Sequence, residues 1–261
     1  MKRLSLVLLA LLAVVLVAAC GGARSKADQD KDGRVLADAI KSADSGSTFS
    51  MSETLVLTGG DIPSGKQAVI QATASGVAKD GNLQFIYRIP EGKTTASFDM
   101  IVADGQLYVR PHNAPTWKSV PATTATALFP ALRLQLIRES VLLAKSVSGS
   151  SLNNTSNGFL RKYAVMPASD QLEQLQSIPL QGSAETVFLK TATAELDAFL
   201  SLSGNKLSRL EVHLNGTDPS TGTKQKIDST MTLKPGTGKL QVIMGPSSAT
   251  PVSPADILTV P

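Results

Sequence analysis

The stretch 80–110, DGNLQFIYRIPEGKTTASFDMIVADGQLYVR, carries the clearest structural signal in the chain. Apolar residues recur at every second position around two Asp-Gly pairs, Asp80-Gly81 and Asp104-Gly105. Successive side chains of a strand point to opposite faces, and a type I′ turn needs positive φ at both of its central positions. The pattern therefore predicts an antiparallel meander. Its predicted strands are 82–89, 95–103, 106–110 and 117–120.

Flanking segments extend this pattern in both directions along the chain. A period of about four predicts a helix at 34–43 before the meander and helical structure within 123–147 after it. We expect a polar loop at 148–158 and a short helix at 168–178. The other predicted strands are 48–58, 67–79, 159–166, 183–191, 194–201, 206–215, 224–233 and 239–244. About ten strands and a few helices, in blocks, predict one α+β domain.

The composition excludes several classes of protein. The 261 residues are 42% hydrophobic and 18% charged, which is typical of a folded domain, and the formal net charge is +4. This slight excess, with no long basic run, gives no signature of nucleic-acid binding. One cysteine excludes an intramolecular disulfide, and two histidines leave little for metal or triad chemistry. The sequence contains no motif of a known catalytic centre, so we expect no enzyme, no cofactor and no metal site.

The N-terminus has the features of an export signal. Lys2 and Arg3 precede a nearly continuous apolar run that is short for a membrane span and ends at Cys20, the single cysteine. The last four residues of this run resemble the lipobox of bacterial lipoproteins, which implies a signal peptide at 1–19 and lipidation of Cys20. An uncleaved anchor is the alternative. We expect a lipidated cysteine and flexible tether at 20–33, followed by the domain at 34–261.

Several features together resemble the LppX/LprA/LprF/LprG family of actinobacterial cell-envelope lipoproteins. They are Cys20, a short helix before a Ser/Thr-rich first strand, and a hairpin at 104–108 that runs on to Trp117. A strand at 207–214 and a Pro-rich end complete the order. The resemblance implies a strongly curved, half-open antiparallel sheet with helices on its concave face. In that family the enclosed apolar cavity holds acyl chains, and LolA-type carriers share the architecture.

Apolar residues on one face of the predicted strands and of the central helix are the candidates for lining such a cavity. These residues are Phe49, Met51, Phe85, Tyr87, Phe98, Met100, Val102, Leu128, Leu132 and Leu136. Ordinary core packing is the alternative for each of them. His213 is expected to point outward, and neither His213 nor His112 has an evident acidic or nucleophilic neighbour in the sequence. Glu195 and Asp197 are expected to share one face of a strand.

Two functions remain open at this level. The first is a lipid-anchored protein on the extracytoplasmic side of the cell membrane that binds a lipid or glycolipid and carries it across or within the envelope. A membrane transporter is then a further candidate partner. The second is a non-catalytic envelope scaffold or sensor that binds a protein. An enclosed apolar pocket favours the first function, and a tightly filled core favours the second.

Overall fold

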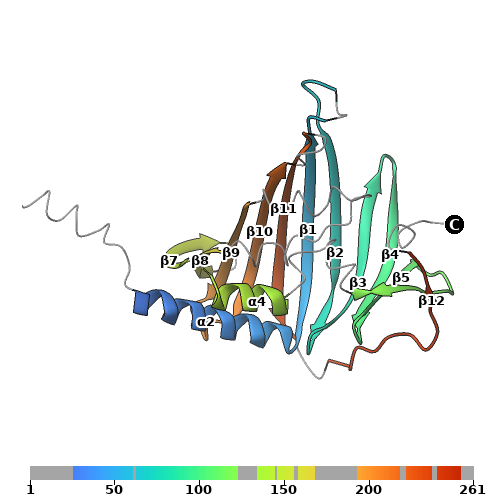
Figure 1. Ribbon diagram of the computed structural model, residues 1–261. Helices are drawn as coiled ribbons and strands as arrows, with labels where there is room; N and C mark the ends of the chain where they lie inside the picture. The colour runs from blue at the N-terminus through green and yellow to red at the C-terminus, as the bar shows by residue number, and fades with distance from the viewer. Residues whose placement is uncertain are drawn as a thin grey trace, which may run out of the picture.

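The computed structural model describes residues 26–60, 63–122, 134–144, 146–155, 158–167, 193–217, 222–236 and 240–253. Its described helices are α2 (Lys26–Asp44) and α4 (Leu134–Leu142). The described strands are β1 (Ser47–Thr58), β2 (Ala68–Lys79), β3 (Asn82–Glu91), β4 (Thr94–Ala103), β5 (Gln106–Pro111), β6 (Lys118–Pro121), β7 (Ser146–Thr155), β8 (Gly158–Met166), β9 (Thr193–Ser201), β10 (Leu207–Thr217), β11 (Lys224–Pro235) and β12 (Thr250–Pro251). Figure 1 shows the strands side by side, with the helices across one end.

The described strands form one 12-stranded sheet in the order β12-β6-β5-β4-β3-β2-β1-β11-β10-β9-β8-β7. Two antiparallel meanders, β1 to β6 and β7 to β11, meet where β1 pairs with β11. Only the short contact between β12 and β6 is parallel. The chain thus folds its two β blocks into one continuous sheet.

The predicted meander is confirmed down to its turns. The strand bounds agree with the sequence pattern to within two residues. Both Asp-Gly pairs have positive φ at both positions, with 52° and 81° at Asp80 and Gly81 and 54° and 72° at Asp104 and Gly105. These are the signs that a type I′ turn requires.

The start of the first helix corrects an expectation. Residues 26–33, which the sequence analysis assigns to a flexible tether, are the first turns of α2. Gly33 is buried, and a Cβ there would lie 3.6 Å from Val147 Cγ2 and 3.8 Å from the Val141 carbonyl oxygen. The close packing of α2 against α4 and β7 stabilises these turns. The sequence of 26–33 has no helical period of apolar residues, so it did not predict a helix there.

Two more expectations are wrong. Residues 148–155, predicted as a polar loop, belong to β7, because Ser, Asn and Thr side chains are tolerated on an edge strand whose backbone pairs with β8. The described part of 239–244, predicted as a strand, is irregular and crosses the outer side of β2 and β3. There Lys79 donates a hydrogen bond to the Leu240 carbonyl (2.7 Å) and Asn82 to the Ile243 carbonyl (3.1 Å). The predicted helix at 168–178 and strand at 183–191 lie outside the described residues.

The sheet has two different faces. We call the side on which α2 packs the inner face, because Leu36, Ala37 and Ile40 of this helix belong to the same buried cluster as the alternate apolar residues of β1 to β5 and β8 to β11. A smaller cluster on the outer face joins Ile101 and Ala103 to Ile243 of the C-terminal segment. The main hydrophobic core therefore lies on the inner face.

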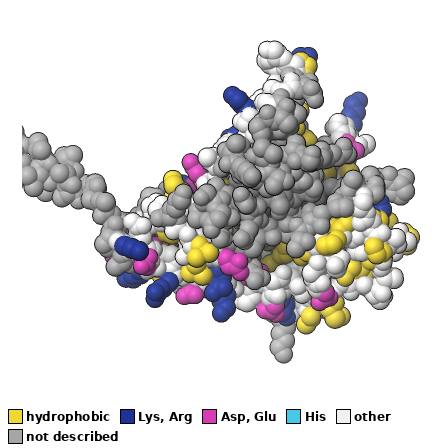
Figure 2. Space-filling model, in the orientation of Figure 1, with side chains coloured by type: hydrophobic (Ala, Val, Ile, Leu, Met, Phe, Trp, Pro, Cys, Tyr) yellow, Lys and Arg dark blue, Asp and Glu magenta, His cyan; other side chains and the backbone are white. Residues whose placement is uncertain are grey.

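The structure agrees only in part with the predicted half-barrel. The described sheet is mostly antiparallel and carries two described helices, but it is open and not strongly curled. Its edges, β12 with β6 at one end and β7 at the other, are not paired with each other in the described residues. In Figure 2 charged side chains of both signs lie over the exposed side of α2, so this helix presents its polar side to solvent and its apolar side to the sheet.

Candidate functional site

The inner face brings together the predicted cavity residues that the structure describes. The main buried cluster contains all seven: Phe49, Met51, Phe85, Tyr87, Phe98, Met100 and Val102, the last only half-buried. Leu136 lies in α4, where its side chain is not described. Leu128, Leu132 and Cys20 lie outside the described residues. A role of these residues in binding a ligand stays a prediction.

Strand register explains why these side chains meet. Phe85 is paired with Gly76 on one side and with Met100 on the other. Phe49 is paired with the same Gly76 from β1, and the rings of Phe49 and Phe85 lie 6.1 Å apart across it. A Cβ on Gly76 would lie 2.1 Å from the Gln84 carbonyl oxygen, so no side chain fits at this point. The two aromatic rings meet where the strand between them has no side chain.

Small residues continue along the inner side of β2. Ala72, Ala74 and Ala78 are buried on the inner face, and the residues between them that face outward are exposed or half-buried. On the neighbouring strands, the inner positions carry Phe49 and Met51 of β1 and larger side chains of β3. The strand therefore forms a low strip between two higher rows of side chains, because alanine projects one methyl group where Phe and Met project a long side chain.

Burial changes along β1. Phe49 and Met51 are 5% and 3% exposed, whereas Leu55 and Leu57, further along the same face, are half-buried. Ile70, the partner of Leu55 in β2, is 45% exposed. The helices cross the sheet at the end where β1 begins (Figure 1), so the apolar surface is more accessible at the end away from α2.

A carboxyl group interrupts this apolar surface. Glu53 lies between Met51 and Leu55 on the inner side of β1, opposite Ser229 of β11. The Ser229 hydroxyl, which is completely buried, donates a hydrogen bond of 2.6 Å to Glu53 Oε2. In the described residues of β1, β2, β10 and β11, Glu53 is the one carboxylate on the inner face. The sequence analysis missed it, although a charged residue in the apolar phase of an alternating strand is a readable signal.

The surroundings of Glu53 favour its neutral form. Burial raises the pKa of Glu53 to about 7, and the hydrogen bond from Ser229 opposes that shift only partly. Burial also raises the pKa of Tyr87, with a further contribution from the nearby Glu53 charge. Tyr87 reaches this region from β3 across the small side chain of Ala74, its partner in β2. Glu53, Ser229 and Tyr87 thus form a small polar centre on an apolar face.

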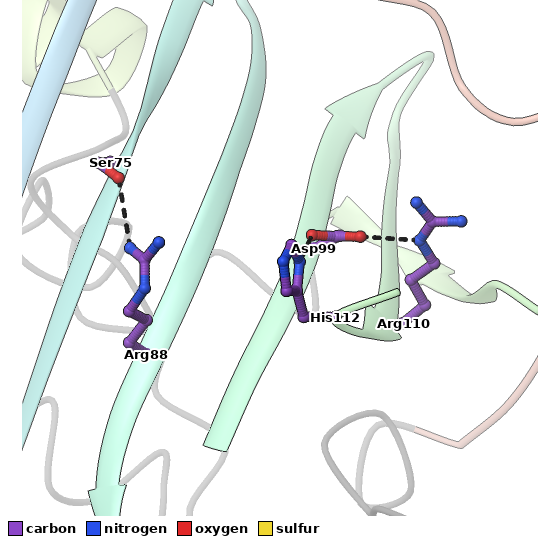
Figure 3. A network of polar contacts seen from close by, with 5 residues as sticks. All are labelled: Ser75, Arg88, Asp99, Arg110 and His112. Atoms are coloured by element: carbon purple, nitrogen blue, oxygen red, sulfur yellow. Dashed lines mark hydrogen bonds and ion pairs between the residues drawn. The ribbon is translucent and has the colours of Figure 1, made fainter. Parts of the chain in front are cut away.

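The outer face carries ion pairs instead. Figure 3 shows Asp99 of β4 between two basic groups, with Arg110 Nε 2.9 Å from Asp99 Oδ2 and His112 Nδ1 2.6 Å from Asp99 Oδ1. Burial acts to raise the pKa of Asp99, but the hydrogen bonds from His112 and Arg110 outweigh it and lower the pKa. The Arg110 guanidinium also lies 4.4 Å from the centre of the Trp117 ring. His112 therefore has an acidic neighbour, contrary to the expectation from sequence.

His213 has one as well. It points outward, as predicted, and its Nδ1 lies 2.7 Å from Asp228 Oδ1 of the paired strand β11. Lys226 Nζ lies 2.8 Å from the other oxygen of Asp228. Local sequence does not reveal such partners because they come from other strands. Both hydrogen-bonded His–Asp pairs are half-exposed or exposed on the outer face.

A possible cation site on this face has another explanation. Donor atoms of Asp197, Glu211 and His213 lie within 4.8 Å of one another. However, Asp197 is ion-paired with Lys162, and Glu211 Oε1 lies 3.0 Å from Arg209 Nε. The positive charges already balance both carboxylates, so the cluster is a surface network of ion pairs.

Hollows on the described residues lie away from the polar centre. One of about 620 Å³ lies between the start of α2 and the first residues of β7, and its lining includes Lys26, Asp30 and Arg34. Another, of about 480 Å³, lies on the outer face near Asp99 and Trp117. The first has several charged groups in its lining. The second combines the Asp99–Arg110 ion pair with apolar side chains such as Val77, Ile86 and Trp117.

Comparison with known proteins gives distant similarity. No protein-family model matches the chain, and none of the curated proteins matches it. Among solved structures, the chain is similar to LprF from Mycobacterium bovis (13% identity, TM-score 0.41, 84% of this chain and 98% of that one). It is also similar to LppX from Mycobacterium tuberculosis (12%, 0.43, 80% and 95%) and to a LolA-superfamily protein from Nitrosomonas europaea (10%, 0.31, 76% and 93%). In the described part of the chain, no helix is both long enough and apolar enough to span a membrane.

Proposed function

We propose that this protein is a lipid-anchored protein of the cell envelope that binds the acyl chains of a lipid or glycolipid against the inner face of its sheet. It carries this lipid within or across the envelope. The bound chains lie in an apolar cavity between the sheet and the segments that pack on its inner side. This function unites the export signal that ends at Cys20 with the apolar side of the sheet.

The observation that carries the proposal is that the apolar side chains of one continuous face are buried to different extents at its two ends. Near α2 the inner residues are almost fully buried, whereas Leu55, Leu57 and Ile70 keep accessible surface at the opposite end. Accessible apolar area that continues from a core is what an acyl chain needs, because its burial releases about 25 cal/mol per Å². Along β2, the small buried side chains of Ala72, Ala74 and Ala78 would present only methyl groups to a bound chain, beside the larger side chains of β1 and β3.

The methionines of the inner face fit the same function. Met51 and Met231 are cross-strand partners at the junction of the two meanders, and Met100 lies on β4. An unbranched thioether side chain adapts to irregular shapes, which suits a binding surface for flexible chains. The sequence resemblance to envelope lipoproteins points in the same direction.

The decisive experiment is native mass spectrometry of the domain purified from its own host without residues 1–20. We expect a lipid to co-purify with the wild-type domain. The test variant is Val102→Trp, because Val102 is half-buried on the inner face and the larger ring would occupy the space of an acyl chain. Ile86→Trp is the matched control, because Ile86 is half-buried on the outer side of the neighbouring strand β3.

The expected result is a loss of lipid in Val102→Trp with a nearly unchanged denaturation midpoint, while Ile86→Trp keeps its lipid. Over-packing of a tightly filled core costs about 1–3 kcal/mol, so a sharp fall of the midpoint with unchanged lipid would place Val102 in ordinary core. A wild-type domain without any lipid would favour the scaffold function instead.

The anchor has its own test. Cys20→Ala should release the full chain from the membrane fraction, because the lipid attached to the cysteine is the proposed means of attachment. Ser5→Ala, in the same N-terminal segment, is the control and should stay with the membrane. Persistent sedimentation of Cys20→Ala after a carbonate wash would contradict the lipidation of Cys20.

A further inference from the structure

The polar centre of Glu53 and Ser229 is unexpected on a surface for plain acyl chains. Leucine at position 53 would continue the apolar pattern of Met51 and Leu55. A buried carboxyl group costs free energy unless it is hydrogen-bonded, and an acyl chain offers it no hydrogen bond. The chemistry at this position therefore needs a partner that a hydrocarbon chain does not supply.

The hydrogen bonds of Glu53 leave room for one more donor. Its Oε2 accepts the hydrogen bond from Ser229, and a carboxyl group keeps further acceptor capacity in either protonation state. The described residues show no partner for Oε1. The residue Glu53 is also half-buried, whereas Ser229 beneath it is completely buried, so the accessible surface of this pair belongs to Glu53.

The position of the pair fits a contact made by a bound ligand. Glu53 lies where the burial of the inner face changes along β1. Met51, on the side of α2, is buried, and Leu55, on the other side, is half-buried. A chain that follows the low strip of β2 passes Ala72, the partner of Glu53 in that strand. Tyr87 borders the same place from β3.

We propose that the bound lipid carries a hydroxyl group that donates a hydrogen bond to the Glu53 carboxyl, held in place by Ser229. This inference rests on the proposed function and adds the chemical class of the ligand, a hydroxylated lipid. The hydroxyl group has two sources, a hydroxylated acyl chain or a polyol headgroup such as glycerol or a sugar. In both cases the apolar face binds the chain. The hydrogen bond to Glu53 selects for the hydroxyl group and fixes the position of the lipid along the inner face.

The experiment compares three probes that share one saturated chain. Methyl stearate has no hydroxyl group, methyl 12-hydroxystearate carries one on the chain, and 1-monostearoylglycerol carries two on its headgroup. Each probe competes with a fluorescent fatty-acyl ester for the delipidated domain. We expect at least one hydroxylated probe to bind the wild type about 10-fold more tightly than methyl stearate, the size of one hydrogen bond to a buried group. The hydroxylated probe that gains affinity identifies the source.

The variants separate the hydrogen bond from the fold. In Glu53→Leu with Ser229→Ala, both polar partners are replaced together, so that no buried hydroxyl is left unpaired. We expect this double variant to bind all three probes equally and methyl stearate at least as tightly as the wild type does. Glu53→Gln keeps an acceptor oxygen and should keep the preference. Asp228→Asn, on the outer side of the same strand β11, should leave it unchanged.

Each result decides between the two proposals. Equal binding of the three probes by the wild type, or a preference that survives in the double variant, would overturn the role of Glu53 and leave the proposed function standing. Failure of the wild type to bind even methyl stearate would overturn the proposed function and this inference with it. Binding of methyl stearate by the double variant also shows that this variant has folded.

Discussion

Asp228 and Ser229 are neighbours in β11, yet they belong to opposite sides of the sheet and to opposite electrostatic surroundings. Ser229 is completely buried on the inner face and donates its hydroxyl hydrogen to Glu53. Asp228 is half-buried on the outer face, next to His213 and Lys226. One step along a strand thus separates a carboxyl site that favours protonation from one that favours charge.

The two carboxyl groups differ because of their partners and their access to water. Burial raises the pKa of Glu53 to about 7, and Ser229, its hydrogen-bond partner among the described residues, is neutral. Burial also acts to raise the pKa of Asp228, but hydrogen bonds from Lys226 and His213 outweigh it and lower the pKa. The outer face therefore accommodates charge by pairing, while the inner face accommodates one carboxyl group by neutralising it.

The largest expected effect comes from neighbours in β10 that face opposite sides. Leu210 is fully buried on the inner face, and its truncation in Leu210→Ala should lower the free energy of unfolding by about 2–5 kcal/mol. Glu211 next to it is ion-paired on the outer face, and Glu211→Ala should cost less than about 1 kcal/mol. Urea denaturation of the two variants measures both changes. Similar losses would contradict the division into a packed and a solvated face.

The second expected effect is the pH dependence that Glu53 adds to stability. Because its pKa is raised from 4.5 to about 7 in the folded state, the folded protein binds more protons than the unfolded chain within that window. Stability should therefore be highest below about pH 4.5 for this group and fall as the pH rises to about 7. The total for the group is on the order of 3 kcal/mol.

Glu53→Gln removes this titration and keeps the shape of the side chain. Denaturant midpoints of the wild type and of Glu53→Gln, measured between pH 4.5 and 8, give the contribution of Glu53 as the difference between the two curves. Parallel curves across this range would show that the carboxyl group is better solvated than the structure indicates.

The smallest expected effect has the opposite sign and belongs to Asp228. The pKa of Asp228 is lowered from 3.8, so its contribution is present above that value and is lost as the pH falls through the folded pKa. Because Asp228, His213 and Lys226 are partly exposed, we expect only about 0.2–1 kcal/mol. Asp228→Asn should remove this loss of stability as the pH falls below 3.8. If Asp228→Asn changed the pH dependence of stability more than Glu53→Gln does, the outer carboxyl group would contribute more than the inner one, contrary to this comparison.

Local patterns predicted much of the sheet. The alternation at 82–110 and the two Asp-Gly pairs fixed the strands and turns of the first meander, because side-chain period and turn geometry are properties of a few adjacent residues. The same alternation placed Phe85, Met100 and Val102 on one face. It did not predict the strand at 146–155, whose polar residues lack a period and which is held by its pairing with β8.

The polar centre shows what local patterns do not predict, namely contacts between residues far apart in the sequence. Both Glu53 and Ser229 occupy apolar phases of their strands, between Met51 and Leu55 and between Ile227 and Met231. Each exception is visible alone, but the sequence does not show that they meet, because they lie 176 residues apart. The same holds for His213, which the sequence analysis left without an acidic neighbour and which lies beside Asp228 of the paired strand.

The sequence by itself determined the periodicity of the strands, the hairpin turns, and the division of apolar and polar side chains between two faces. These properties depend on neighbouring residues and on composition. The tertiary structure alone decided that β1 pairs with β11, and with it that Glu53 lies opposite Ser229. It also decided that α2 extends back to Lys26. Long-range pairing and packing determine these features, since a carboxyl group acquires its partners and its pKa from the strands beside it.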